Sequence, residues 1–188
     1  MIEALNSFDR NLFLLLNSFH IPAANPVMQF LSGQFIWIPF IGYFLFYSFR
    51  HYGKKFTLHF AFFLLLALVA SDATSSYIIK NIVNRLRPCR EIDLKPLIYS
   101  FGQKCGGKFG FVSSHAANAM ALIIFSIKGL KFKKVTASLM IFIPIFVGYS
   151  RIYLGVHYPG DIFCGILVGI TWGYVFSKMF KSIKELND

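Results

Sequence analysis

The sequence predicts an all-α integral membrane protein: a bundle of five or six spanning helices plus an N-terminal amphipathic helix at the membrane interface. Composition is the first observation, because 56% of the 188 residues are hydrophobic and 18% are aromatic. Only 14% are charged, whereas soluble domains average about 25%. The third observation is that apolar runs long enough to cross a bilayer alternate with short basic stops. The whole chain, residues 1–188, is predicted to be one membrane-embedded domain.

The elements follow in order along the chain. Residues 1–20 place apolar residues at helical spacing but include too many polar ones to span, which indicates an interfacial helix. If this helix also spans, the count becomes six. The second span is longer than a bilayer needs, so its end should project from the membrane. The five predicted spans cover about 25–49, 56–86, 113–127, 135–153 and 161–180.

Basic residues suggest an orientation. With five spans, residues 50–55, 128–134 and the C-terminal tail share one side, and these short, dense stops resemble cytoplasmic anchors. We therefore expect a multi-pass protein of the cytoplasmic (inner) membrane, with the N-terminus outside. The net charge of +11 favours anionic lipids and phosphate as partners rather than nucleic acid, since the cations fall between apolar runs.

This topology brings four chain segments to one membrane face: the end of the second span, the start of the third, the end of the fourth and the start of the fifth. The unusual polar residues occur at these four places. Polar groups near hydrocarbon are a functional-site hypothesis by default, because burying them unpaired costs several kcal/mol. The residues are Lys80, Arg87, Ser113, Ser114, His115, Ser150, Arg151, His157 and Asp161.

Three cations beside a helix N-terminus describe a phosphate site. His157, oriented by Asp161, is suited to attack phosphorus, and His115 to protonate the leaving oxygen. No metal or other cofactor is required, because the protein supplies the positive charge. Two alternatives stay open. The two histidines and Asp161 could bind zinc, although flanking arginines would repel the metal. Each residue could instead be structural, with Asp161 a helix cap, His157 an interfacial residue and Arg151 a headgroup anchor.

The pattern resembles the three signature motifs of the type 2 phosphatidic acid phosphatase (PAP2) superfamily. The motifs are Lys80-x6-Arg87-Pro88, Ser113-Ser114-His115 and Ser150-Arg151-x5-His157-x3-Asp161, and they cover residues 80–161. The second motif departs from the family's Pro-Ser-Gly-His, because Val112 and Ser114 replace Pro and Gly. The resemblance implies a metal-independent lipid phosphatase with a phosphohistidine intermediate. Its catalytic residues would be His157, His115 and Asp161, and its phosphate-binding residues Lys80, Arg87, Ser113, Ser114 and Arg151.

The resemblance also suggests substrates. Undecaprenyl diphosphate is the leading expectation, followed by lipid A, then phosphatidylglycerophosphate or phosphatidate, with the active site facing the periplasm or cell exterior. No obligate protein partner is inferred. A non-enzymatic alternative is an anion or phospholipid transporter, which would use the cations but leave His157 and His115 without a task.

A pair of cysteines and an aspartate within a predicted span are two further features of the sequence. Cys89 and Cys105 share the polar loop that we place outside the cytoplasm, where a disulfide is favoured over two free thiols. Asp72 lies two helical turns before Lys80. It could position that lysine, or it could form an interhelical hydrogen bond, which is the favoured interpretation.

Overall fold

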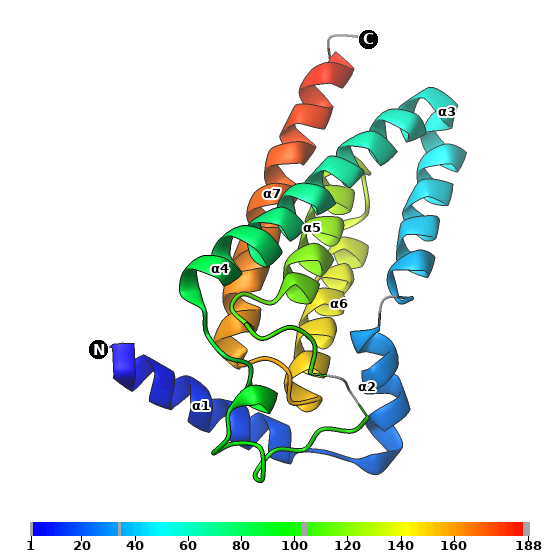
Figure 1. The fold of residues 1–188 in the computed structure, drawn as a ribbon. Helices are drawn as coiled ribbons and strands as arrows, with labels where there is room; N and C mark the ends of the chain where they lie inside the picture. The colour runs from blue at the N-terminus through cyan, green and yellow to red at the C-terminus, as the bar shows by residue number, and fades with distance from the viewer. Residues whose placement is uncertain (1, 34, 103–104, 186–188) are drawn as a thin grey trace.

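The computed structural model describes residues 2–33, 35–102 and 105–185, and helices dominate them (Figure 1). Within those ranges no strand forms, and the sole β-type contact is an isolated bridge between Leu86 and Phe109. The α-helices are α1 (Ile2–Ser18), α2 (Asn25–Ser32), α3 (Trp37–Asp72), α4 (Lys80–Val83), α5 (Ser114–Gly129), α6 (Lys134–Tyr153) and α7 (Pro159–Glu185). Short 3-10 turns cover Pro22–Ala24 and Pro88–Arg90, and a π-helical stretch, Ala73–Ile79, joins α3 to α4.

Helix α3 is two arms joined at Gly53. This residue has φ +80° and ψ 178°, a backbone conformation that glycine adopts without steric cost. The ribbon reverses direction there, so the second arm returns towards the end of the bundle where α1 lies (Figure 1). Three helices of the described residues are long and apolar enough to cross a membrane: Trp37–Val83, Lys134–Tyr153 and Pro159–Ser182. The protein is therefore an integral membrane protein, and its longest candidate span includes the reversal at Gly53.

Three sequence predictions about helix ends were wrong. The span predicted over 25–49 is broken, because α2 ends at Ser32 and Gly33 is extended (φ −78°, ψ 169°). The helix predicted to reach residue 86 ends at Val83, where Asn84 turns into the left-handed region (φ 52°). Asp161 does not cap α7 from outside. It is the third residue of that helix, and its Oδ2 accepts from the Tyr158 N–H (3.0 Å), as an acidic residue does in a capping box.

The N-terminal helix α1 lies across the end of the bundle (Figure 1). Phe13 is fully buried against Tyr158, while Leu5, Phe8 and Phe19 are exposed. Asn17 fixes the helix in place, because its Nδ2 donates to the carbonyls of Ile152 (3.0 Å) and Tyr153 (2.9 Å). Helix α1 thus joins the bundle through one face and presents apolar side chains on the other, as an interfacial helix does.

Helices α5 and α7 approach most closely at three glycines of α7. A Cβ added to Gly165 would lie 2.5 Å from the Ser113 carbonyl oxygen, and one on Gly173 would lie 2.8 Å from that of Ala121. At Gly169 the added atom would meet the Ala117 carbonyl oxygen. Small residues four apart let helix backbones pack directly in membranes. A phenylalanine-rich core, including Phe44, Phe60, Phe63, Phe125 and Phe180, fills the bundle at the end near Gly53.

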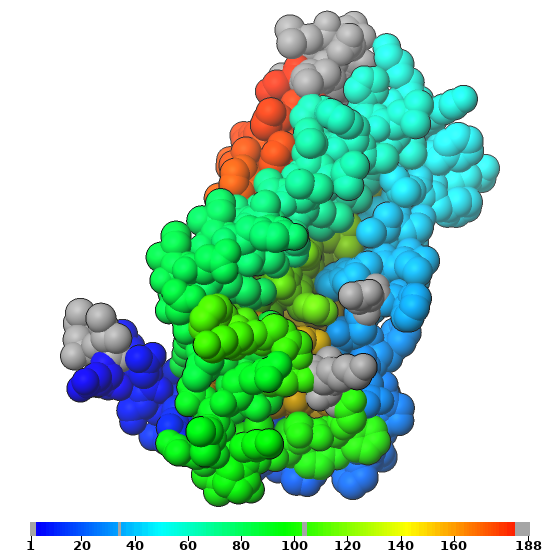
Figure 2. Space-filling model, viewed as in Figure 1, coloured from blue at the N-terminus to red at the C-terminus, as the bar shows by residue number. Residues whose placement is uncertain are grey.

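The remaining polar elements gather at the end of the bundle where α1 lies. Figure 1 shows α4, the start of α5, the end of α6 and the start of α7 there, together with the loop that links α4 to α5. In the space-filling view the surface is hollowed between the α3–α4 arm and α2, and atoms of α5 are seen within it (Figure 2). The four segments expected on one face therefore lie at one end.

We predict that Gly169→Ala lowers the free energy of unfolding by about 1–3 kcal/mol, because the new methyl group must push α5 away from α7. The measurement is thermal unfolding in detergent. Gly42→Ala in α3 is the matched control, since nothing lies within 4 Å of its added Cβ. Equal melting of the two variants would contradict the close α5–α7 packing.

Candidate active site

His157 is held by two contacts at the bottom of the site. Its Nδ1 lies 3.2 Å from Asp161 Oδ2, and its Nε2 lies 2.7 Å from Arg87 Nη1. Asp161 is fully buried, and His157 is 1% exposed. A carboxylate can only accept and a guanidinium can only donate, so the network assigns the proton to Nδ1. The Nε2 lone pair therefore points at the cation.

The surroundings also keep the imidazole neutral. Burial is the main cause that lowers the pKa of His157 well below its ordinary value, and the charges of Arg87 and Arg151 lower it further. Both effects disfavour the imidazolium, the first by desolvation and the second by repulsion. A neutral ring whose Nε2 carries no proton is the form that acts as a nucleophile.

Arg87 reaches His157 from the loop between α4 and α5. Its Nε donates to the Gly107 carbonyl (2.9 Å) and its Nη1 also contacts the Val156 carbonyl (3.2 Å). The loop is closed by a disulfide between Cys89 and Cys105, whose Cα atoms are 6.0 Å apart. Arg87 is thus fixed by both sides of a cross-linked loop rather than by a helix face shared with Lys80.

Gly110 in this loop packs against His157 and Asp161. An added Cβ would lie 3.0 Å from Asp161 Oδ2, 3.2 Å from Arg87 Cγ and 3.6 Å from His157 Nδ1. The Gly110 N–H donates to the Arg85 carbonyl (2.8 Å), which places the glycine beside the end of α4. From the sequence, this glycine is predicted only to be part of a loop. Its role depends on a close approach that spacing does not reveal.

The start of α5 supplies the second motif. Ser113 caps the helix by accepting from the Ala116 N–H (3.4 Å), and its own N–H donates to the Asp161 carbonyl (2.9 Å). Ser114, which stands where the family has glycine, accepts from Lys80 Nζ (3.2 Å). His115 follows in the first helical turn and makes no hydrogen bond to any described residue. The charged or ionisable side chains that act on it electrostatically are Arg151, His157, Lys80 and Arg87.

Arg151 enters from the end of α6 and is 6% exposed. Its Nη1 donates to the carbonyl of Ser32 (3.0 Å) and to the Ser32 hydroxyl, so it binds the C-terminal end of α2. Its Nε is buried and finds no hydrogen-bond partner among the described residues. This orphaned donor suits an incoming anion, because an unsatisfied buried donor costs about 1–3 kcal/mol. Ser32 was missed because it lies in a span that was predicted to be continuous.

Arg85 and Asp9 are the other two residues that sequence reasoning missed. Arg85 Nη1 lies 3.0 Å from Asp161 Oδ1 and 2.7 Å from Asp9 Oδ2. Its guanidinium carbon lies 4.0 Å from the centre of the Tyr158 ring. Asp9 in α1 also accepts from the Gly160 N–H (2.8 Å). Arg85 therefore binds Asp161, and through Asp9 it connects this carboxylate to helix α1.

In the part of the chain that the structure describes, the side chains that could bind a metal do not form a cluster. No three His, Cys, Asp or Glu side chains there come close enough to hold a metal ion together. The zinc ligand set considered from the sequence therefore has no matching cluster of side chains.

A buried neutral histidine, a supporting carboxylate and several cations at one end of a helical membrane bundle define the class of integral membrane phosphatases. The chain belongs to the PAP2 superfamily, whose family model matches residues 60–185. The protein is a lipid phosphatase.

Relatives and a solved structure agree with this placement. The chain is 34% identical to a lipid A 4'-phosphatase of Bacteroides thetaiotaomicron, over 94% of this chain and 78% of that protein. It is 31% identical to one of Porphyromonas gingivalis (95% and 75% covered). It is 29% identical to an undecaprenyl-diphosphatase of Sulfolobus acidocaldarius (93% and 79% covered). The fold matches a PAP2-type phosphatidylglycerolphosphate phosphatase from Bacillus subtilis with TM-score 0.75 at 22% identity, covering 96% of this chain and 88% of that one.

We predict that Arg85→Gln lowers kcat/KM roughly 10- to 100-fold, the usual effect of losing a residue that orients a functional histidine through its partner. Removing this positive charge also raises the pKa of His157, because Arg85 is one of the cations that lower it. The acidic limb of the kcat/KM profile should therefore move to higher pH.

The control is Arg90→Gln, which removes a cation of the same loop that contacts the Gly106 carbonyl and no carboxylate of the site. It should leave the limb in place. A profile for Arg85→Gln that coincides with that of Arg90→Gln would exclude a positioning role for Arg85.

Proposed function

We propose that the protein removes a phosphate group from a membrane lipid through a phosphohistidine formed on His157. The observation that carries this proposal is the pair of contacts on its imidazole, which leaves the Nε2 lone pair facing Arg87. That guanidinium occupies the position where phosphate oxygens would be neutralised. When substrate binds, Arg87 exchanges its contact with Nε2 for one with a phosphate oxygen, which frees the nucleophile.

The first half-reaction breaks the bond between phosphorus and the lipid oxygen. Nε2 attacks phosphorus, and the leaving oxygen takes a proton from His115, so the products are a lipid hydroxyl and phospho-His157. Asp161 stabilises the positive charge that develops on the imidazole. Arg87, Arg151 and Lys80 face the growing negative charge on the phosphoryl oxygens, together with the backbone N–H of Ser114 in the first turn of α5.

The second half-reaction uses water. His115, now neutral, removes a proton from the water molecule while its oxygen attacks phosphorus and the bond to Nε2 breaks. Inorganic phosphate leaves, and His115 carries the proton for the next cycle. Neither half-reaction needs a metal, since protein cations provide the electrostatic stabilisation.

We further propose five membrane crossings: the two arms of α3, then α5, α6 and α7, within one domain. Helix α5 has 16 residues and would span roughly 24 Å, which is short for a bilayer core of about 30 Å. Its inclusion is supported by its packing between α3 and α7, and its N-terminus would then lie below the membrane surface. The basic stops at the Gly53 end favour the cytoplasmic side of the inner membrane, with the site facing the periplasm or exterior.

Among substrates, a lipid A phosphate is now the leading proposal, ahead of the undecaprenyl diphosphate favoured by sequence reasoning. Two relatives with that activity in their names align over 94% and 95% of this chain. Undecaprenyl diphosphate remains the second candidate, supported by the relative from Sulfolobus acidocaldarius. The sequence alone does not rank these substrates, because the spans consist mostly of Phe, Leu and Ile, whereas the relatives favour lipid A.

The test is phosphate release by the purified protein in detergent with EDTA present. Lipid A bearing a 4'-phosphate and undecaprenyl diphosphate would be offered separately. We expect release to persist in EDTA and to fall at least about a thousandfold in His157→Ala, since removing a nucleophile abolishes its covalent step. His59→Ala is the control, because the one hydrogen bond of that half-buried histidine among the described residues is to the Lys55 carbonyl of its own helix. Release by His157→Ala at the rate of His59→Ala would overturn the proposal.

A further inference from the structure

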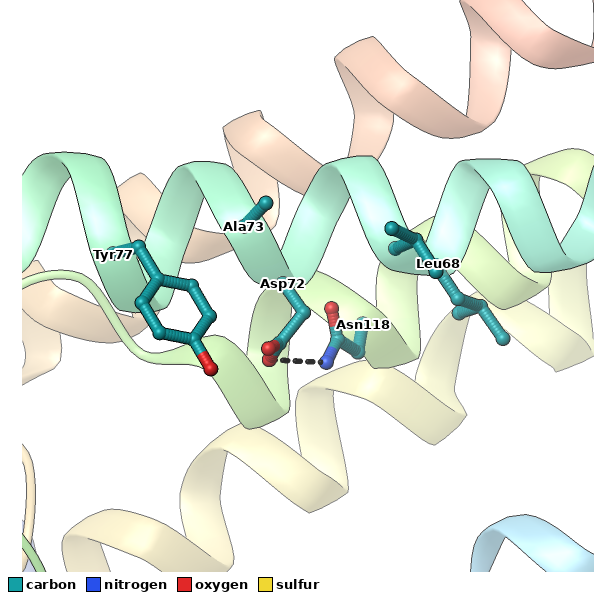
Figure 3. A pocket seen from close by; sticks show the side chains of 6 residues that line it. Leu68, Asp72, Ala73, Tyr77 and Asn118 are labelled. Atoms are coloured by element: carbon teal, nitrogen blue, oxygen red, sulfur yellow. Dashed lines mark hydrogen bonds between the residues drawn. The ribbon is translucent and has the colours of Figure 1, made fainter.

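A second polar feature lies deeper in the bundle, beside the π-helical stretch. A pocket of about 330 Å³ is lined by Leu68, Val69, Asp72, Ala73, Tyr77 and Asn118. In Figure 3 the side chains of Asp72 and Asn118 meet in the middle, with Tyr77 and Leu68 on either side. Val69 and Tyr77 are more than half exposed, so the pocket opens on the side of the bundle that would face lipid.

The polar groups of this pocket are arranged as acceptors. Asp72 Oδ1 receives two hydrogen bonds, from Asn118 Nδ2 (3.1 Å) and Ser76 Oγ (3.2 Å). No donor of the described residues approaches the second carboxylate oxygen, Oδ2. Asn118 Oδ1 is buried and also has no partner among those residues. Asp72 Oδ2 lies on the open side of the pocket beside apolar side chains, so it is placed to accept a hydrogen bond from a ligand that donates.

The pocket is connected to the phosphate site by helix α5. Ser114, which accepts from Lys80, and Asn118, which donates to Asp72, are four residues apart and so share one helix face. One turn of α5 separates these two contacts by roughly 6 Å, and the eight residues from Asp72 to Lys80 span roughly 12 Å. A lipid with its phosphate at Lys80 would therefore extend its hydrophobic part past Asp72 Oδ2.

We propose that this pocket is a substrate-specificity site that binds a hydroxyl or amide N–H in the hydrophobic part of the substrate lipid, roughly 6–12 Å from its phosphate. The proposal rests on the proposed phosphatase function and deepens it. Acylated sugar phosphates with amide-linked or hydroxylated chains carry such donors. A polyprenyl diphosphate has none at that distance, since its chain is pure hydrocarbon. The pocket thus selects the first class of lipid over the second.

The π-helical stretch explains how the carboxylate is presented. Asp72 is the residue immediately before Ala73–Ile79, where the helix widens, and such stretches occur often at functional sites. On the side of α7, Trp172 Nε1 donates to Thr74 Oγ1 (2.9 Å), which fixes the widened segment. Asp72 is therefore held by α5 and the π-helical stretch by α7, and Asp72 Oδ2 remains open to the pocket.

The test compares two acylated hexose-phosphate lipids that differ in a single linkage, an amide N–H in one and an ester oxygen in the other. We expect the wild-type protein to prefer the amide by about tenfold in kcat/KM. Asp72→Asn preserves the size of the side chain and its contacts at Oδ1, but it replaces the free acceptor with a donor. It should bring the amide-to-ester ratio of kcat/KM close to one. Asp72→Leu, which has no polar group there, should do the same.

Ser76→Ala is the matched control, because it removes a donor to Oδ1 and leaves both free acceptors in place. Its preference should equal that of the wild type. The ratio of the two lipids does not depend on how much protein is folded, so a poorly folding variant still reports. Equal ratios in wild type and Asp72→Asn would overturn this proposal alone, whereas no phosphate release from either lipid would overturn the phosphatase function itself.

Discussion

The structure depends on one buried electrostatic arrangement, the pair formed by His157 and Asp161. A carboxylate with no exposed surface inside an apolar bundle must be neutralised and hydrogen-bonded, or it would destabilise the fold by several kcal/mol. Its two oxygens meet this requirement through His157, the Tyr158 N–H and Arg85. His157 and Tyr158 directly precede α7, whereas Arg85 follows α4 and also binds Asp9, so satisfying one carboxylate brings together the end of α4, the start of α7 and helix α1.

The same constraint links stability to chemistry. Arg85 and Arg87 lie on opposite sides of the pair, one bound to the carboxylate and the other to the imidazole. Arg85 orients the Asp161 carboxylate, and Arg87 occupies the position where we propose that the substrate phosphate binds. Because Asp9 of α1 binds both Arg85 and the Gly160 N–H, a helix suited to lie on the membrane surface also contacts the catalytic loop. Membrane attachment and the shape of the site are therefore not independent.

Sequence reasoning predicted candidate residues that the structure places at one end of the bundle, and it missed Arg85, Asp9, Ser32 and Gly110, which contact them. Periodicity and basic stops predicted the helices, and topology predicted that Lys80, His115 and His157 share one end. Ser32 and Gly110 were missed because their roles come from contacts between segments far apart in sequence, for which spacing carries no signal. The break between α2 and α3 was hidden by continuous apolar composition. Asp72 was assigned to an interhelical bond, which it makes with Asn118, but its unsatisfied oxygen is visible only once the pocket is formed.

We propose that the phosphoryl group of the substrate is transferred to Nε2 of His157. The most direct measurement mixes the protein with a lipid phosphate, quenches within one turnover at alkaline pH, where phosphohistidine survives, and locates the phosphate by peptide mass spectrometry. We expect a peptide phosphorylated on His157 in the wild-type protein, and no phosphorylated peptide in His157→Ala. Phosphate on His115, or full turnover with no labelled histidine at any time, would contradict it.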